Sequence, residues 1–141
     1  MALDQIFGIA GSALNAQSVR MNTIASNLAN AGTVASTDQD AFRAKRTVFK
    51  AIMEQHGSAQ DGSYQGGLKV KEISNDPSPV RRLLDPGNPL ADKDGYVYTS
   101  NVNEMGEMVD MMAASRSYQN NVEVINTARQ LMMRTLEITK A

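Results

Sequence analysis

The sequence predicts a mainly α protein in which long N- and C-terminal helices pair as an antiparallel coiled coil, with a small β-rich or irregular insertion between them. The C-terminal helix is predicted because neither glycine nor proline follows Gly106. The N-terminal helix is predicted because residues 1–31 carry apolar residues at alternating steps of three and four. All four prolines fall in the middle. We therefore expect three segments, 1–32, 33–100 and 101–141, the first and last forming one helical domain.

The N-terminal helix carries the apolar seam of a coiled coil. Its positions are Phe7, Ala10, Leu14, Gln17, Met21, Ile24, Leu28 and Ala31. Gln17 is the polar interruption of this seam, and Gly32 is well placed to cap the helix end. The outer face holds amides and hydroxyls rather than Lys and Glu, which favours burial against other protein. The alternative is a helix of an ordinary soluble bundle with few charges.

The C-terminal helix carries two apolar tracks at helical spacing. The first comprises Met105, Met108, Met112, Tyr118, Val122, Ile125, Met132 and Leu136, and the second Val124, Ala128, Leu131 and Ile138. A helix of about 35 residues is roughly 50 Å long, whereas a compact domain of this chain length has a radius of gyration of only about 14 Å. The helix therefore needs a long partner, which the N-terminal helix supplies in part. Ser100, Asn101 or Asn103 is expected to cap its start.

The insertion between the helices shows strand and turn patterns. Short strands are expected within 42–48, 68–73, 80–84 and 96–99. Loops are expected at 33–40, at a flexible hairpin tip over 57–67, and at a rigid, shaped turn over 85–97.

Composition limits the function. Apolar residues make up 42% of the chain, aromatics only 5%, and there are nine Met and no Trp, which favours helix-on-helix packing over an aromatic-rich core. The net charge of −1 does not indicate nucleic acid as a partner. No cysteine is present to form a disulfide. The start of the chain lacks a signal-peptide pattern, and no apolar stretch reaches about 20 residues, so we expect neither a cleavable signal nor direct membrane insertion.

No set of residues indicates catalysis, a cofactor or a metal, so we do not expect an enzyme. His56 is the only histidine and lacks the ligand partners of a zinc site. The sequence Asp-Lys-Asp-Gly at 92–95 begins like a calcium loop, but its glycine is misplaced and Asn103 stands where a calcium-binding glutamate is needed. Glu104 and Glu107 are explained by the positive end of the helix dipole.

Four basic residues lie close together in and just after the first expected strand: Arg43, Lys45, Arg46 and Lys50. They could form a phosphate patch, but no interleaved aromatics or glycine-rich cradle accompany them. A strand that faces solvent or another subunit is the favoured interpretation.

Motifs at both ends and in the middle resemble those of a known family. Asn-Val-Asn-Glu-Met-Gly-Glu-Met-Val at 101–109 and Ala-Ser-Arg-Ser-Tyr-Gln-Asn-Asn at 114–121 resemble the C-terminal signature of bacterial flagellar axial proteins. Ser-Ala-Leu-Asn-Ala-Gln at 12–17 and Ala-Ser-Asn-Leu-Ala-Asn at 25–30 resemble their N-terminal rod signature. Asp-Pro-Gly-Asn-Pro-Leu-Ala-Asp at 85–92 is similar to the proximal-rod members.

The resemblance implies a structural subunit of the flagellar basal-body proximal rod. Such a subunit polymerises by terminal-helix packing into a hollow, torque-transmitting shaft that motility requires. The implied partners are further copies, other rod proteins (proximal-rod and distal-rod subunits and the basal-body adaptor protein) and the flagellar type III export apparatus. The implied location is the rod in the periplasm, reached without a cleavable signal peptide. The alternative is a helical-hairpin adaptor or export chaperone that binds a single partner.

The axial helices are expected to form the subunit interface. Its candidate residues are Leu14, Gln17, Met21, Ile24, Asn27, Leu28, Asn30, Met108, Met112, Arg116, Tyr118, Asn121, Val122, Ile125, Leu131, Met132 and Leu136. Amides such as those of Asn27 and Asn121 would set the register. Arg116 and Tyr118 are candidate anchors, although each could be an ordinary helix residue. Charged substitution of Leu28 or Leu131 is expected to abolish assembly, as in Leu131→Asp.

Overall fold

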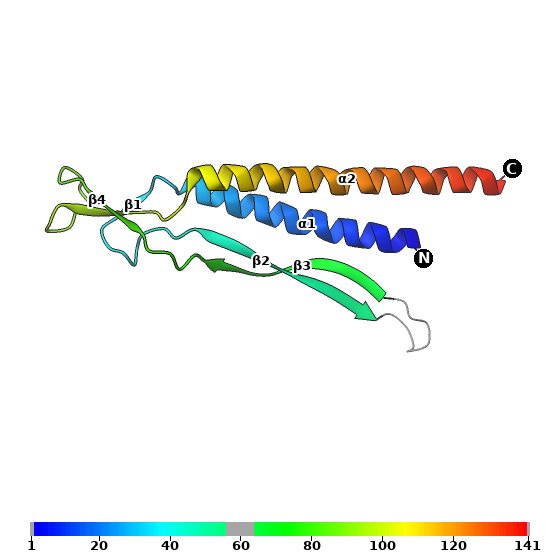
Figure 1. Cartoon of the computed structure of the whole chain (residues 1–141), viewed down its shortest axis with the longest axis horizontal. Helices are drawn as coiled ribbons and strands as arrows, with labels where there is room; N and C mark the ends of the chain where they lie inside the picture. The colour runs from blue at the N-terminus through cyan, green and yellow to red at the C-terminus, as the bar shows by residue number, and fades with distance from the viewer. Residues whose placement is uncertain (1, 56–63, 141) are drawn as a thin grey trace. The chain divides into compact units, whose positions relative to one another are not determined.

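A computed structural model describes residues 2–55 and 64–140, which contain two helices and five strands (Figure 1). Their bounds are α1 Ala2–Ala29, β1 Val34–Ala35, β2 Lys45–Gln55, β3 Tyr64–Asn75, β4 Arg81–Leu84, β5 Tyr96–Thr99 and α2 Glu104–Lys140. The chain divides into two compact units, each of which takes a segment of both helices. The first unit comprises 1–19, 48–72 and 113–141, and the second comprises 20–47 and 73–112.

The expectation of a mainly α coiled coil is wrong, because the described residues form two sheets as well as two helices. Strands β2 and β3 are 11 and 12 residues long and pair with each other. The alternation of apolar and polar residues in the sequence predicted shorter strands than the structure has, because β2 and β3 continue through glycines and charged residues. His56 and the expected hairpin tip up to residue 63 lie outside the described residues. That the terminal helices form one axial domain stays a prediction.

In the first unit, β3 lies against the N-terminal part of α1. The backbone N–H of Leu68 donates to Ser12 Oγ at 3.0 Å, and that hydroxyl donates in turn to the carbonyl of Ile9 at 2.8 Å. A Cβ atom at Gly67 would stand 3.3 Å from Ser12 Oγ, and one at Gly66 would stand 3.6 Å from the end of Ile9. Glycine at these positions lets the strand backbone approach the helix closely.

Among the residues of the first unit whose burial the structure describes, the buried apolar ones are all alanines: Ala10 and Ala16 of α1, and Ala114 and Ala128 of α2. Small side chains allow helices to approach closely, but each buries little apolar area. The larger apolar residues of these helix segments, such as Leu14, Val122 and Ile125, are only half-buried.

The second unit contains a three-stranded sheet in the order β1-β5-β4, antiparallel throughout. Its central strand β5 buries Val97 completely. Opposite Tyr98 on β4 lies Arg82, whose guanidinium stacks 4.4 Å from the ring centre of Tyr96. A small core of Ala31, Ala44 and Val102, with Phe42 packed against it, joins the end of α1 to the start of α2. The unit is thus held by a sheet and a few small apolar residues.

The loop between β4 and β5 has the shaped turn expected from its prolines and glycines. The N–H of Asp85 donates to the carbonyl of Gly95 at 2.9 Å, which closes the loop. Inside it, Asp92 Oδ1 accepts hydrogen bonds from the N–H groups of Asp94 and Tyr96, both at 2.9 Å. Gly95 has a φ of 80°, which glycine adopts at little cost.

The ends of the helices follow the sequence only in part. Asn103 caps α2, because its Oδ1 accepts a hydrogen bond from the N–H of Gly106 at 3.1 Å. The expected cap at Gly32 is wrong, because among the described glycines only Gly95 has the positive φ of a glycine cap. Instead α1 ends at Ala29, and the turn that follows is closed by Thr33, whose N–H donates to the carbonyl of Asn30 at 3.2 Å.

Candidate functional site: exposed helix faces and a polar junction

Helix α2 exposes most of its large apolar residues and buries small or polar ones. Its buried residues include Ala114, Ala128 and Glu107, which is only 2% exposed. Its exposed large apolar residues are Met105, Met108, Val109, Met112, Val124, Leu131, Met133, Leu136 and Ile138. Contiguous exposed apolar surface on a protein marks an interaction site. Within the chain, α2 therefore leaves much large apolar side-chain surface uncovered.

In the second unit this surface is a defined stripe that we name the methionine face: Met105, Met108, Val109 and Met112. The spacing of these residues places them on one side of a helix. Their exposed fractions are 73%, 51%, 56% and 55%. Methionine side chains are flexible and polarizable, so such a face can adapt to the partner that covers it.

In the first unit α1 and α2 line an apolar hollow of about 340 Å³, which we name the helix groove. Its residues are Ile6, Asn120, Glu123, Val124, Thr127, Ala128 and Leu131. The wall residues Val124 and Leu131 remain 46% and 53% exposed, whereas Ala128 is buried. The groove can accept apolar side chains from a partner.

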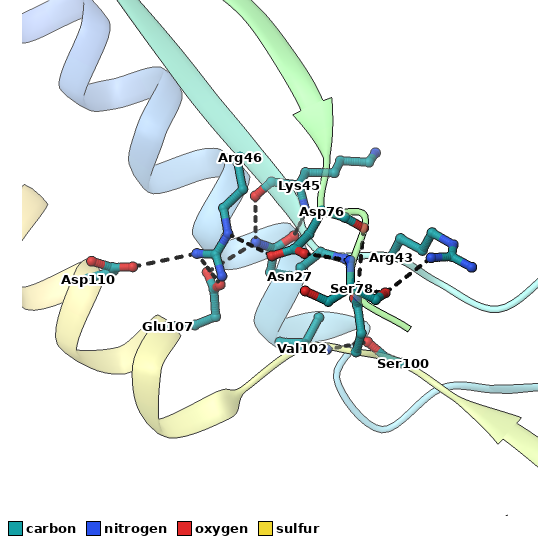
Figure 2. A network of polar contacts seen from close by, with 12 residues as sticks. Asn27, Arg43, Lys45, Arg46, Asp76, Ser78, Ser100, Val102, Glu107 and Asp110 are labelled. Atoms are coloured by element: carbon teal, nitrogen blue, oxygen red, sulfur yellow. Dashed lines mark hydrogen bonds and ion pairs between the residues drawn. The ribbon is translucent and has the colours of Figure 1, made fainter. Parts of the chain in front are cut away.

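A polar junction in the second unit ties α1, β2 and α2 together (Figure 2). At its centre Asn27 is fully buried. Its Nδ2 donates to the carbonyl of Lys45 at 2.9 Å and to Glu107 Oε2 at 3.0 Å, while its Oδ1 accepts from the N–H of Lys45 at 2.8 Å. Every polar atom of the amide thus has a partner, as a buried amide requires.

Arg46 of β2 supplies the positive charge of this junction. Figure 2 shows the guanidinium of Arg46 pointing toward α2. Its Nη1 atom lies 3.1 Å from Glu107 Oε1 and 3.7 Å from Asp110 Oδ2. Its Nε lies 3.5 Å from Asp76 Oδ2. Arg20 of α1 also pairs with Asp110, at 3.2 Å. The buried carboxylate of Glu107 needs these partners, because an unpaired buried charge is strongly destabilising.

The carboxyl group of Asp76 lies at the edge of the junction, beside Arg46. Hydrogen bonds from the side chain and backbone of Ser78 lower the pKa of this carboxyl group below its ordinary value of 3.8, and the charge of Arg46 adds to this effect. The N–H of Ser78 donates to Asp76 Oδ1 at 2.9 Å. Hydrogen bonds to the charged form favour ionisation.

The candidate interface residues occupy three environments. Exposed residues are Met108, Met112, Arg116, Leu131 and Leu136. Half-buried residues are Leu14, Gln17, Met21, Leu28, Asn30, Tyr118, Asn121, Val122, Ile125 and Met132. Ile24 and Asn27 are buried within the chain. The exposed set comes entirely from α2, so the structure gathers the accessible candidates on one helix.

The candidate amides bond within the chain. Asn30 and Asn121 each donate from Nδ2 to a carbonyl of their own helix, those of Ser26 and Ser117, both at 2.8 Å. Their role in setting the register between subunits stays a prediction.

The basic cluster also makes bonds within the chain. Arg43 pairs with Asp38 at 3.0 Å and donates to the carbonyl of Ser78 at 3.1 Å, while Arg46 holds the polar junction. These arginines are occupied by acids and carbonyls, which leaves the phosphate interpretation without support.

Sequence reasoning missed the polar junction. The sequence analysis assigned Glu107 to the helix dipole and Arg46 to a strand that faces solvent or another subunit. In the structure the two side chains form an ion pair, with 3.1 Å between Arg46 Nη1 and Glu107 Oε1. The burial of Glu107 beside Ala114 and Ala128 on one face of α2 is evident only from the structure.

Two further features bear on function. Among residues 2–55 and 64–140 no group of three or more metal-ligating side chains comes together. Within the same residues, neither helix has the combination of length and apolarity that crossing a membrane demands.

Comparison with known proteins defines the class. The model "Flagella basal body rod protein" matches residues 7–34, and the model "Flagellar basal body rod FlgEFG protein C-terminal" matches residues 93–138. The two matches cover most of α1 and α2, the helices that carry the groove and the methionine face. A fold with these exposed terminal helices is that of a flagellar basal-body rod protein.

Curated relatives identify the family within this class. The chain is 51% identical to "Flagellar basal-body rod protein FlgC" of Yersinia enterocolitica, over 98% of each chain. It is 50% identical to that of Escherichia coli O6:H1 and 49% identical to that of Salmonella typhimurium, again over 98% of each chain. The chain belongs to the FlgC family of flagellar basal-body rod proteins, whose members are structural subunits of the rod.

Proposed function

We propose that this chain builds the rod by packing the exposed apolar faces of its terminal helices against neighbouring rod subunits. One observation carries the proposal: α2 buries alanines inside the chain and leaves four of its methionines, both of its leucines and Ile138 exposed. Burying a large apolar side chain gains about 1.5–3 kcal/mol, a gain that the isolated chain leaves unused along α2. Assembly supplies that burial.

The proposed product is a hollow shaft that transmits torque. Packed interiors resist compression and transmit strain, so helices packed side by side over many contacts make a stiff tube. The proposed neighbours are further copies of this chain, other proximal-rod and distal-rod proteins, and the basal-body adaptor protein. We further propose delivery by the flagellar type III export apparatus to the periplasm. Similarity to structural rod proteins supports a structural and non-catalytic role.

The experiment changes the methionine face without disturbing the fold. Met108→Asp places a charge at a position that is 51% exposed in the chain and buried in the proposed rod. The isolated variant should keep its stability within about 0.5 kcal/mol, as surface substitutions do, yet fail to restore swimming in cells that lack the protein. Leu131→Asp should act in the same way. Normal swimming with Met108→Asp contradicts the proposal.

A matched control carries the same change in charge elsewhere on α2. Gln130 is exposed and polar, and Gln130→Asp should swim normally. Denaturation of the purified proteins separates the two causes of failure. If a variant has lost stability, its cells fail to swim because the fold is damaged. If a variant is stable and its cells still do not swim, assembly is the step that fails.

A further inference from the structure

Strands β2 and β3 carry an excess of positive charge. Together they hold five basic and two acidic residues, which gives them a net charge of +3. The whole chain carries −1, so its other residues together carry −4. The paired strands are therefore a basic element of an otherwise slightly acidic chain.

Three of these bases line one hollow of about 550 Å³, which we name the lysine hollow. Its residues are Lys50, Ala51, Ile52 and Met53 of β2, and Lys69, Val70 and Lys71 of β3. Lys69 and Lys71 are two residues apart, so their side chains leave the same face of β3. Among the described residues, no acidic one lines the hollow.

The lysines of the hollow are not neutralised within the described chain. In residues 2–55 and 64–140, neither Lys50 nor Lys69 takes part in an ion pair. Lys71 Nζ lies 3.7 Å from Glu72 Oε1, but both side chains are more than half exposed, and such surface pairs contribute little. An anionic partner would relieve the repulsion between the three charges.

The strand that carries two of these lysines is held in place by α1. The N–H of Leu68 donates to Ser12 Oγ at 3.0 Å, and Gly67 lets the backbone approach the same hydroxyl. Lys69 follows directly in the chain. Charges carried by an anchored strand are positioned more precisely than charges on a loop.

We propose that the lysine hollow binds an acidic segment of another protein, one that carries apolar side chains among its carboxylates. The carboxylates pair with the three lysines. The apolar side chains pack on the apolar wall, in which Met53 is 75% exposed and Ile52 and Val70 are half-buried. The proposal concerns a surface outside the two helices and goes beyond the function proposed above.

The composition of the hollow favours this occupant over a second copy and over a membrane. Within residues 2–55 and 64–140, no three acidic side chains come together closely enough to share a metal ion, so a second copy offers no acidic cluster to match three lysines. Lipid headgroups offer charge without apolar side chains, whereas the wall of the hollow includes an isoleucine, a valine and a methionine.

Binding of short peptides to the purified full chain tests the chemistry. The probe is the fluorescein-labelled peptide Glu-Glu-Leu-Glu-Glu-Leu, followed by fluorescence anisotropy. We expect it to bind, and Lys50→Gln/Lys69→Gln/Lys71→Gln should weaken binding at least about tenfold, because each exposed pair contributes modestly and three act together. The peptide Glu-Glu-Ser-Glu-Glu-Ser should bind several-fold more weakly, because it has no apolar side chain to bury.

A matched control removes three exposed positive charges that lie outside the hollow. Lys93→Gln/Arg129→Gln/Arg134→Gln has the same net charge as the first triple variant. It should bind the probe as tightly as the wild type does. Both triple variants are first shown to keep the urea midpoint of the wild type.

A charge reversal tests whether cells use the hollow. Lys69→Glu should impair swimming in cells that lack the protein, whereas Lys93→Glu, also at an exposed lysine, should swim normally. Cells selected for recovery of swimming should carry a change of an acidic residue to lysine or to a neutral residue in a second protein. If Lys69→Glu lowers the urea midpoint, Lys71→Glu replaces it.

Four outcomes overturn the inference: equal affinities of the two triple variants for the probe, tighter binding to phosphatidylglycerol vesicles than to the probe, normal swimming with Lys69→Glu, or recovery only through changes in this chain. None of them touches the helix faces, so each leaves the proposed rod function standing. That function fails separately, if Met108→Asp swims normally.

Discussion

The side chain of Asn27 donates to Glu107 Oε2 at 3.0 Å, and this bond joins α1 to α2 where both residues are buried. Because Asn27 also exchanges two hydrogen bonds with the backbone of Lys45, one amide fixes three elements of the second unit at once. The apolar core of the unit is formed by Ala31, Ala44 and Val102, with Phe42 packed against them. The hydrogen bonds of Asn27 therefore contribute much to fixing how α1, β2 and α2 pack in this unit.

Asn27→Ala should destabilise the second unit strongly. The change removes three hydrogen bonds and leaves the buried Glu107 carboxylate and the backbone N–H and carbonyl of Lys45 without their Asn27 partners, which should lower the free energy of unfolding by about 2–4 kcal/mol. Urea unfolding followed by circular dichroism measures the loss. Asn30→Ala is the control, since that amide bonds only to its own helix, and it should cost less than about 1 kcal/mol. Equal losses for the two variants would show that the junction does not hold the unit.

The helices could be predicted from the sequence because their signals are local. The lack of glycine and proline after Gly106 and the spacing in 1–31 led to helices over 101–141 and 1–31, and the structure has Glu104–Lys140 and Ala2–Ala29. The sequence did not predict in the same way which side of each helix is buried. Hydrophobic patterns assign large apolar residues to the interior, whereas here Ala10 is buried and Leu14 only half-buried. A chain that completes its packing in an assembly breaks that assumption.

The polar junction could not be predicted because its partners are far apart in sequence. Nothing near Arg46 indicates that its charge is matched by Glu107 and Asp76 rather than by solvent or phosphate. The lengths of β2 and β3 could not be predicted for a related reason. Hydrogen bonds between the two paired strands continue through polar residues and glycines, where neither strand shows an alternation of apolar and polar residues.

Acid should weaken the second unit through Asp76. Its pKa is lowered in the folded state, mainly by hydrogen bonds from Ser78. The folded state therefore binds this proton less readily than the unfolded state does. The ionised Asp76 therefore contributes fully to stability at pH values above its pKa in the unfolded state, which is near the ordinary 3.8. This contribution disappears as the pH falls through the lower pKa of Asp76 in the folded state.

Comparing wild type with Asp76→Asn isolates this effect. The wild type should be the more stable protein at neutral pH, and the difference should shrink as pH falls below 3.8, as measured by urea unfolding at a series of pH values. Asp94→Asn, which alters an exposed residue, provides the control for general charge effects. A difference that stays constant between neutral and acidic pH would rule out this role of Asp76.

Gly95→Ala should strain the loop between β4 and β5. The residue has a φ of 80°, and an added Cβ atom would lie 3.2 Å from Cγ of Pro86. A left-handed non-glycine residue costs about 1–2 kcal/mol before any contact is counted. Thermal unfolding should show this loss. Gly87→Ala in the same loop is the matched control: its Cβ would meet only Asp85 Oδ1 at 3.8 Å, so its midpoint should change little. If both variants lower the unfolding midpoint equally, the positive φ of Gly95 is not the cause of the loss.

Gln17→Met should stabilise the chain. Among the described residues, Gln17 Oε1 is buried without a hydrogen-bond partner, within the segment of α1 that belongs to the first unit. An unsatisfied buried polar group costs about 1–3 kcal/mol, and methionine has a similar length and no group that needs a partner. The free energy of unfolding should rise by about 1 kcal/mol, while Asn15→Met at an exposed position should change it by less than about 0.5 kcal/mol.

The same variant tests the role of Gln17 in assembly. Because its oxygen is buried inside the chain, a neighbouring subunit cannot reach it without moving the helix. Cells with Gln17→Met should therefore swim as well as the wild type. A variant that is more stable but does not swim would show that this amide bonds to another subunit in the rod. Gln17 would then be a register-setting residue of the interface, and the unsatisfied oxygen would mark the place where a partner's donor enters.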